Sequence, residues 1–264
     1  MNVFKLADIE KIAQQAGELI MQIYQQEFAV ETKADDSPVT EADLKANAHI
    51  MAALAELTPQ YPILSEEMKP ADFSERGSWD TYWLIDPLDG TKSFVQRTDE
   101  FTVNIALIQN HKPVLGVVYV PATGHGYCAQ QGLGAFQREP EGELVPIQCR
   151  KAEKIPTVLG SLTVRPRLKA FLQDVGAHDY HAMHSSLKIC LVAAGEADVY
   201  PRLWATSEWD TAAAHAIINE AGGRLVKMDN ETLMYNQKES LLNPEFLAYG
   251  DSAVEWCRFV PPMA

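Results

Sequence analysis

The spacing of apolar residues changes along the chain, and this change constrains the fold more than any other feature of the sequence. Apolar residues recur at helical spacing between Ile9 and Ile23, with polar residues on the opposite side. A second helix is predicted to begin after Thr40, a good N-cap residue, and to run to about Leu57. Two amphipathic helices are therefore expected, and each must bury one side against another layer of the fold.

Short runs rich in β-branched and aromatic residues follow these helices and predict strands at 61–64, 82–85, 102–108 and 114–120. From about residue 155, strands and helices alternate. The elements predicted there are strands at 157–162 and 197–200 and helices at 166–172, 186–194 and 211–220. We therefore expect an α+β fold of packed layers, with an N-terminal α+β part (1–150), a C-terminal α/β part (151–264) and a binding site at their junction.

Composition and charge exclude several classes of protein. The 264 residues are 47 % hydrophobic and 22 % charged, which is typical of a soluble globular protein and excludes disordered and fibrous classes. A net charge of −14 disfavours nucleic acid as a partner. Apolar runs are too short to cross a membrane, and the first residues carry acids, so a cytoplasmic protein is expected. Four widely spaced cysteines predict reduced thiols rather than a zinc or redox pair.

The clearest chemical signal is an apolar strand that ends in Asp86 and is followed by Pro87. Pro87 predicts a four-residue turn with Asp86 and Asp89 at its ends, about 7 Å apart or less. Two carboxylates about 4 Å apart repel each other by about 4 kcal/mol at an effective dielectric constant near 20, which favours a bound cation. Oxygen ligands, including the carbonyl of Leu88, suit Mg²⁺ or Mn²⁺ better than zinc. The alternative is an ordinary Asp-Pro turn.

Neighbouring residues and three other acids could complete such a site. Gly90 lets the backbone come close to a ligand, and Thr91 stands where a helix can begin. Glu66 follows an apolar run and is predicted at the end of a strand, although it could also be a solvated loop residue. Asp43 equally fits a capping box, and Asp210 equally fits the N-cap of an alanine-rich helix.

Four segments, in this order along the chain, resemble the sequence motifs of the inositol monophosphatase superfamily. They are Ser37 to Asp43, Leu64 to Glu67, Trp83 to Lys92 and Trp209 to Ala213. Within that superfamily, residues 86–94, 100–107, 185–188 and 198–202 resemble the 3′(2′),5′-bisphosphate nucleotidases of the CysQ type. The likeness extends from about residue 3 to about residue 250, and it implies the layered α/β/α/β/α sandwich of inositol monophosphatases and fructose-1,6-bisphosphatases.

The resemblance implies a role for each matching residue. The magnesium ligands would be Glu66, Asp86, the Leu88 carbonyl, Asp89 and Asp210. Asp43 and Thr91 would activate the attacking water, with Glu66 also among the catalytic residues and without a covalent phosphoenzyme. Two or three Mg²⁺ ions are expected, Mn²⁺ is an alternative, and Li⁺ is the expected inhibitor.

A second phosphate group on the substrate would need partners other than these metal ions. Lys188 and Arg202, together with the hydroxyls of Ser185 and Ser186, are the candidates, because arginine offers a bidentate fork and lysine a point charge. The alternative is that both cations lie on the surface. The resemblance adds Gly90, Thr91 and Asp210 to the substrate-binding set.

The sequence departs from the family pattern at two places. Ala214 stands where relatives usually carry glycine, and Gly160 to Arg165 replaces a Ser-Arg-Ser-His sequence. Separately, His178, His181 and His184 recur every third residue, but they lack the context of a metal site and are interpreted as polar histidines. One of them could still contact the substrate.

These features together predict a Mg²⁺-dependent phosphatase that converts adenosine 3′,5′-bisphosphate to AMP and phosphate in sulfate assimilation. The alternatives are an inositol monophosphatase or a catalytically silent module that binds metal or anions. The expected partner is a small 3′-phosphorylated adenine nucleotide. Homodimer formation and loose association with the cytoplasmic side of the inner membrane are left open.

Overall fold

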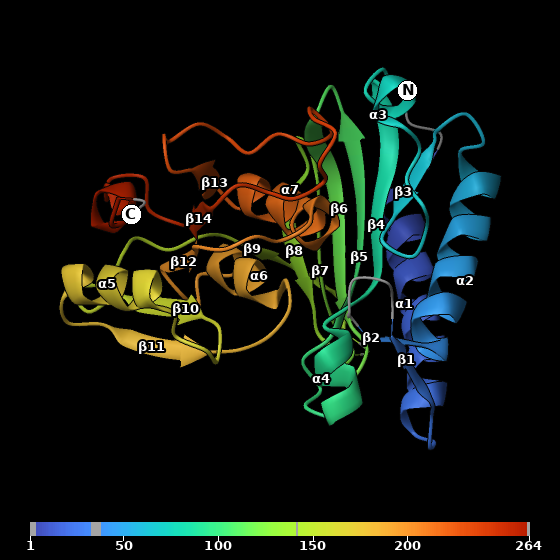
Figure 1. Ribbon diagram of the computed structural model, residues 1–264, viewed down its shortest axis with the longest axis horizontal. Helices are drawn as coiled ribbons and strands as arrows, with labels where there is room; N and C mark the ends of the chain where they lie inside the picture. The colour runs from blue at the N-terminus through green and yellow to red at the C-terminus, as the bar shows by residue number, and fades with distance from the viewer. Residues whose placement is uncertain (1–3, 33–37, 141, 263–264) are drawn as a thin grey trace.

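Five alternating layers of helices and sheets make up the computed structural model, which describes residues 4–32, 38–140 and 142–262 (Figure 1). Helices α1 (Leu6–Tyr24) and α2 (Glu41–Leu57) cover the outer face of a seven-stranded sheet. Helices α6 (Leu187–Ala193) and α7 (Ala212–Glu220) lie between this sheet and a five-stranded sheet, and α5 (Pro166–Val175) covers the far side. This order of layers confirms the predicted fold class.

The seven-stranded sheet has the order β3-β4-β5-β6-β7-β8-β9, so its strands are neighbours in sequence as well as in space. Its strands are β3 (Ile63–Ser65), β4 (Thr81–Asp89), β5 (Thr102–Gln109), β6 (Lys112–Val120), β7 (His125–Gln130), β8 (Gly134–Arg138) and β9 (Leu144–Ile147). Only β3 and β4 pair in parallel. The predicted strands correspond to β3 to β6. Strands β7 to β9 were not predicted, because β8 and β9 are mostly half-buried or exposed and β7 mixes polar residues and glycine with its apolar ones, which weakens the apolar signal.

The five-stranded sheet has the order β11-β10-β12-β14-β13. Its strands are β10 (Thr157–Gly160), β11 (Asp179–Ala182), β12 (Val199–Arg202), β13 (Arg224–Lys227) and β14 (Phe246–Tyr249). The smaller elements are β1 (Val30–Thr32), β2 (Pro38–Thr40), α3 (Phe73–Arg76), α4 (Thr91–Gln96) and the 3₁₀ helices η1 (Glu208–Asp210) and η2 (Trp256–Phe259). Predicted strands 157–162 and 197–200 correspond to β10 and β12, and the three C-terminal helices form as predicted.

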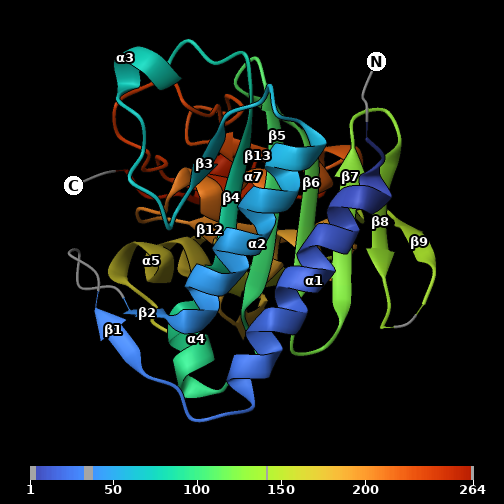
Figure 2. The same ribbon diagram turned by 90° about the vertical axis from the view of Figure 1, so that its right-hand side faces the viewer.

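Both N-terminal helices form for the reasons that the sequence suggested. Helix α1 buries one apolar side, and Figure 2 shows it lying next to α2 across the seven-stranded sheet. The hydroxyl of Thr40 caps α2 by accepting a hydrogen bond from the backbone N–H of Ala42 at 3.2 Å. Ser37, the first residue of the corresponding motif, lies outside the described residues.

Three apolar clusters fill the spaces between the layers. One joins α1 and α2 to the outer face of the seven-stranded sheet, and another packs α5 and η2 on the five-stranded sheet. The third cluster lies between the two sheets and contains α6 and α7. In the described part of the chain, no helix is long and apolar enough to cross a membrane, and the four cysteines are free thiols.

Helix α7 approaches the seven-stranded sheet closely because β6 carries a glycine where the two meet. A Cβ atom added to Gly116 would lie 2.1 Å from the backbone oxygen of Ala213. The glycine that allows this approach is therefore on the strand and not on the helix. Ala214, at the position of the departure from the family pattern, is fully buried, and helix α7 continues through it without a break.

We predict that Gly116→Ala destabilises the protein by about 1–3 kcal/mol, because the helix and sheet must separate to admit the methyl group. The measurement is the free energy of unfolding from urea denaturation. Gly126→Ala on β7 is the matched control, since the atoms nearest to a Cβ there would be 3.7 Å away. Equal stability changes in both variants would contradict this view of the contact.

Candidate active site

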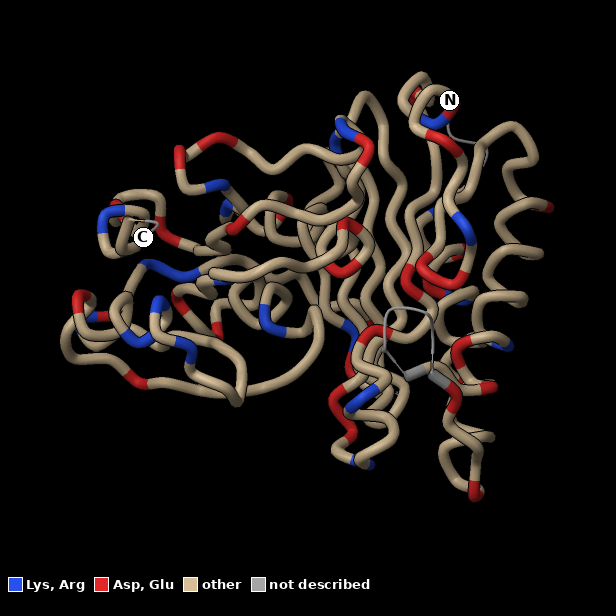
Figure 3. The backbone as a smooth tube through the Cα atoms, viewed as in Figure 1, with Lys and Arg blue, Asp and Glu red and all other residues tan. Residues whose placement is uncertain are grey.

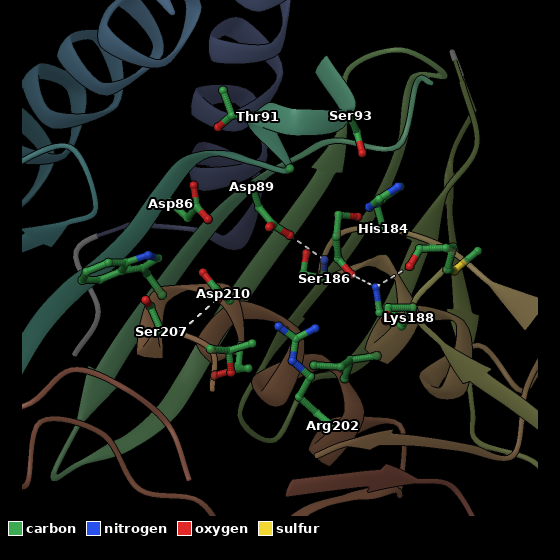
Figure 4. A pocket seen from close by; sticks show the side chains of 18 of the residues that line it. Asp86, Asp89, Thr91, Ser93, His184, Ser186, Lys188, Arg202, Ser207 and Asp210 are labelled. Atoms are coloured by element: carbon green, nitrogen blue, oxygen red, sulfur yellow. Dashed lines mark hydrogen bonds between the residues drawn. The ribbon is translucent and has the colours of Figure 1, made fainter. Parts of the chain in front are cut away.

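A cavity of about 410 Å³ opens at the junction of the two sheets (Figure 4). Its walls come from the ends of β3 and β4, from α4, from the start of α6, from β12 and from η1. Most of the residues proposed from the sequence line it. They are Glu66, Asp86, Leu88, Asp89, Gly90, Thr91, Ser185, Ser186, Lys188, Arg202 and Asp210. Asp43 is fully buried and reaches the site through Thr91.

The predicted turn between Asp86 and Asp89 is wrong in form. The chain stays in strand β4 through Asp89, and its pairing with β5 shifts register between the two aspartates. The backbone N–H of Leu88 donates to the carboxylate of Asp86 at 3.1 Å, which stabilises this bulge. Asp86 pairs with Asn104 of β5, and Asp89 pairs with Thr102. Because both ends of the segment are paired, the sheet keeps it extended, although Pro87 alone favours a turn.

Strand pairing brings a carboxylate from another part of the chain beside Asp86. Strands β3 and β4 are parallel with Ser65 opposite Ile85, and the backbone N–H of Glu66 continues this ladder to the Ile85 carbonyl at 3.2 Å. Glu66, which follows Ser65, therefore lies beside Asp86, which follows Ile85. Asp210 reaches the same place from η1, and one oxygen from each of the three carboxylates lies within 4.8 Å of the other two.

These carboxylates are held together at an energetic cost. Burial and the neighbouring charges of Glu66 and Asp89 raise the pKa of Asp86 well above its usual value. Burial and the charge of Asp89 likewise raise the pKa of Asp210 well above its usual value. Oxygen Oδ2 of Asp86 is buried and has no hydrogen-bond partner. An all-oxygen donor set with an unpartnered buried carboxylate oxygen fits a hard divalent cation.

Asp89 borders this trio and is fixed by residues that the sequence analysis did not assign. Its Oδ2 accepts the backbone N–H of Ser186 at 2.5 Å (Figure 4). The same oxygen accepts the hydroxyl of Thr102 at 3.4 Å. The side-chain oxygen of Asn104 accepts the Ser186 hydroxyl at 2.9 Å. Thr102 and Asn104 both lie in β5, inside the segment 100–107 that resembles the nucleotidases, but no local pattern singles them out.

Thr91 and Asp43 form the predicted pair. The Thr91 hydroxyl lies 3.0 Å from Oδ1 of Asp43, while Oδ2 of Asp43 accepts the backbone N–H and the hydroxyl of Thr40. Asp43 thus completes the capping box of α2 and also contacts the site, so the two interpretations of this residue do not exclude each other. Burial raises the pKa of Asp43. Gly90 precedes Thr91 with a φ of 91°, a conformation that favours glycine.

Cationic side chains lie on the other side of the cavity. Lys188 is only 3 % exposed, which excludes the alternative of a surface cation, and its ammonium donates to the carbonyls of Met183 and Ser185. Burial lowers the pKa of Lys188 to about 7. Arg202 is half-buried with its guanidinium carbon 4.4 Å from the ring centre of Trp204, and its buried Nε atom has no hydrogen-bond partner.

The three histidines do not form a metal site among the described residues. His181 is exposed and His178 is half-buried, whereas His184 lines the cavity and its backbone N–H donates to Glu100 at 2.8 Å. Ser161, from the segment that departs from the family pattern, also lines the cavity. Figure 3 shows acidic and basic positions interleaved over both parts of the chain.

Comparisons with known proteins agree with this fold. A sequence profile of the inositol monophosphatase family matches residues 4–256, so the chain belongs to this family. The chain is 46 % identical over 243 residues to the 3′(2′),5′-bisphosphate nucleotidase CysQ of Salmonella typhimurium, covering 91 % of this chain and 98 % of that protein. The CysQ of Escherichia coli K12 is 45 % identical over the same coverage.

Solved structures give the same result. The crystal structure of CysQ from Bacteroides thetaiotaomicron superimposes with a TM-score of 0.80 at 40 % identity, covering 93 % of this chain and 96 % of that one. An inositol monophosphatase from Thermotoga maritima superimposes with a TM-score of 0.78 at 26 % identity, covering 94 % of this chain and 93 % of that one. The family consists of metal-dependent phosphatases, and the carboxylate cluster fits that chemistry.

We predict that Asp86→Asn stabilises the metal-free protein at pH 7.5. The pKa of Asp86 is raised on folding, so this residue favours folding only at low pH and opposes it once the pH rises through its unfolded pKa. The measurement is urea denaturation in EDTA, and the expected gain is on the order of 1 kcal/mol or more.

Asp198→Asn is the control for this prediction. Asp198 is equally buried but binds Arg150 at 2.7 Å and accepts the backbone N–H of Thr157, so its charge is compensated. Its substitution should destabilise the protein. A loss of stability in both variants would show that the charge of Asp86 is not the source of strain.

Proposed function

We propose that the chain is a Mg²⁺-dependent phosphatase that hydrolyses adenosine 3′,5′-bisphosphate to AMP and phosphate and so clears a by-product of sulfate assimilation. The observation that carries this proposal is the division of one cavity into an acidic side and a cationic side. A substrate with two phosphate groups matches such a cavity, because one phosphate requires metal ions and the other requires protein cations. The similarity to the CysQ nucleotidases supports the same substrate.

The metal ions would be held by Glu66, Asp86, the Leu88 carbonyl, Asp89 and Asp210. Mg²⁺ bound there would lower the pKa of water and stabilise the charge that develops on the phosphate being cleaved. The protein contributes the rigid placement of these oxygens on β3, β4 and η1. We propose Li⁺ as an inhibitor that competes for part of this site.

The attacking water would be oriented by Thr91. The hydroxyl of Thr91 donates its only proton to Asp43, which leaves the oxygen free to accept a hydrogen bond from water. Threonine alone is too weak a base to take a proton at neutral pH, but Asp43 is buried behind it and can receive one. The raised pKa of Asp43 makes its carboxylate a better proton acceptor.

The second phosphate would bind to Lys188 and Arg202. Both side chains line the cavity, and Arg202 has a buried N–H group that the protein leaves without a partner. The hydroxyl of Ser185 lies on the same side, just before α6, whereas the hydroxyl of Ser186 already donates its proton to Asn104. Ser185 adopts a φ of 58°, so the loop that presents these groups is held in a conformation uncommon for serine.

We predict that Lys188→Met lowers kcat/KM for adenosine 3′,5′-bisphosphate by about 10- to 100-fold, the value of one hydrogen bond to a charged group. The matched comparison is adenosine 3′-monophosphate, which lacks the second phosphate. The substitution should lower kcat/KM for this substrate much less. Phosphate release is the measurement. An equal loss for both substrates would contradict the assignment of Lys188 to the 5′-phosphate, and a preference of the wild type for inositol 1-phosphate would favour an inositol monophosphatase.

Metal removal provides an independent test. EDTA should reduce phosphate release to background, Mg²⁺ should restore it, and Li⁺ should inhibit in the presence of Mg²⁺. Asp86→Asn and Asp89→Asn should each remain inactive when Mg²⁺ is added back, because each lacks a carboxylate oxygen of the site. A wild-type protein without activity on any phosphate monoester would instead indicate a silent binding module.

A further inference from the structure

A buried side-chain network lies behind Asp210, outside the cavity. Arg76, the last residue of α3, is 2 % exposed, and its guanidinium donates to the side-chain oxygen of Asn236 and to the carbonyls of Lys238 and Glu239. The side-chain amide of Asn236 donates in return to the Arg76 carbonyl at 2.5 Å. These reciprocal bonds join α3 to a loop 160 residues further along the chain. Figure 2 shows α3 beside the orange-red C-terminal part.

Asn236 connects this pair to η1. Its backbone N–H donates to the carboxylate of Glu208 at 2.7 Å, and Glu208 is the first residue of η1, two positions before Asp210. Both Glu208 and Asn236 are buried. The same loop also binds the backbone of η1, since the N–H of Glu208 donates to Leu241 at 2.8 Å and the amide of Asn243 donates to Ser207 at 2.7 Å.

The position of Asp210 needs such support. Helix η1 is only three residues long: the backbone N–H groups of Asp210 and Thr211 donate at 3.2 and 3.3 Å, and the Ser207 N–H donates to the Asp210 carboxylate at 2.9 Å. All of these bonds lie within one turn, so they do not attach it to the rest of the fold. A turn of this kind is weak by itself. Repulsion from Asp86 and Glu66 would move Asp210 away from the other carboxylates if η1 were free to shift.

We propose that Arg76 is a positioning residue for the metal site. It fixes the loop around Asn236, this loop fixes Glu208, and Glu208 holds Asp210 beside Asp86 and Glu66. Arg76 does not line the cavity, so it would contact neither substrate nor metal. The inference rests on the proposed metal site, and it explains why a large charged side chain is buried at the end of a four-residue helix.

The test compares metal affinity in Arg76→Met and in the wild type. Methionine fills much of the same volume but donates no hydrogen bonds. The probe is Mn²⁺, whose binding is followed by the loss of the free-ion electron paramagnetic resonance signal, and the concentration of Mg²⁺ that gives half-maximal activity is a second readout. Loss of groups that orient metal ligands costs about 10- to 100-fold in affinity. We expect a weakening in this range, with a smaller fall in kcat at saturating Mg²⁺.

Arg138→Met separates positioning from general stability. Arg138 forms a part-buried ion pair with Glu10 at 3.1 Å, between β8 and α1. Its loss should lower the free energy of unfolding and leave Mn²⁺ affinity unchanged. Within the network, Glu208→Gln keeps an oxygen that can accept the Asn236 N–H, so it should retain the affinity that Glu208→Ala loses.

Two results would overturn the inference. One is wild-type Mn²⁺ affinity in Arg76→Met, and the other is an equal weakening in Arg138→Met. If Arg76→Met does not fold, Asn236→Gly carries the same test, because glycine suits the φ of 53° at that position. Failure of the proposed function would look different, since wild-type protein would then bind Mn²⁺ no better than Asp86→Asn does.

Discussion

Repulsion among clustered carboxylates is the physical constraint on which the rest of the structure depends. Oxygens of buried Asp86 and of half-buried Glu66 and Asp210 approach within 4.8 Å of one another, although desolvation and neighbouring negative charge raise the pKa of Asp86 and of Asp210. A fold can maintain this arrangement only if each carboxylate is attached to an element that cannot move away. The register of β3 and β4 fixes two of them, and the packed loop around η1 fixes the third. Bound divalent cations would convert this cost into binding energy.

The layered architecture supplies the required rigidity and also creates the cavity. Helices α6 and α7 lie between the two sheets, so their ends lie where segments from both parts of the chain meet. The close contact of α7 with Gly116 on β6 fixes the distance between the helix layer and the seven-stranded sheet. Consequently the acidic side, from β3, β4 and η1, and the cationic side, from α6 and β12, face one cavity. This division matches a substrate that carries two phosphate groups.

Sequence reasoning identified the residues that directly line the cavity but only part of what holds them. The Asp-Pro-Leu-Asp segment indicated a cation site because its carboxylates are close in sequence, although the strand keeps it extended as a bulge rather than a turn. Thr102, Asn104 and Asn236 gave no such signal, since single polar residues in loops and strands are common. Their importance arises from contacts with partners that are distant in sequence.

The sequence by itself determined the two N-terminal helices, the central strands, the class of fold and the set of acids, because periodicity and short motifs depend on neighbouring residues. Only the tertiary structure decided how these acids meet, that Lys188 is buried, and that Arg76 stands behind Asp210. Such facts depend on strand register and on packing between segments more than a hundred residues apart. No local pattern encodes that information, because the free energy of these contacts is realised only when the layers assemble.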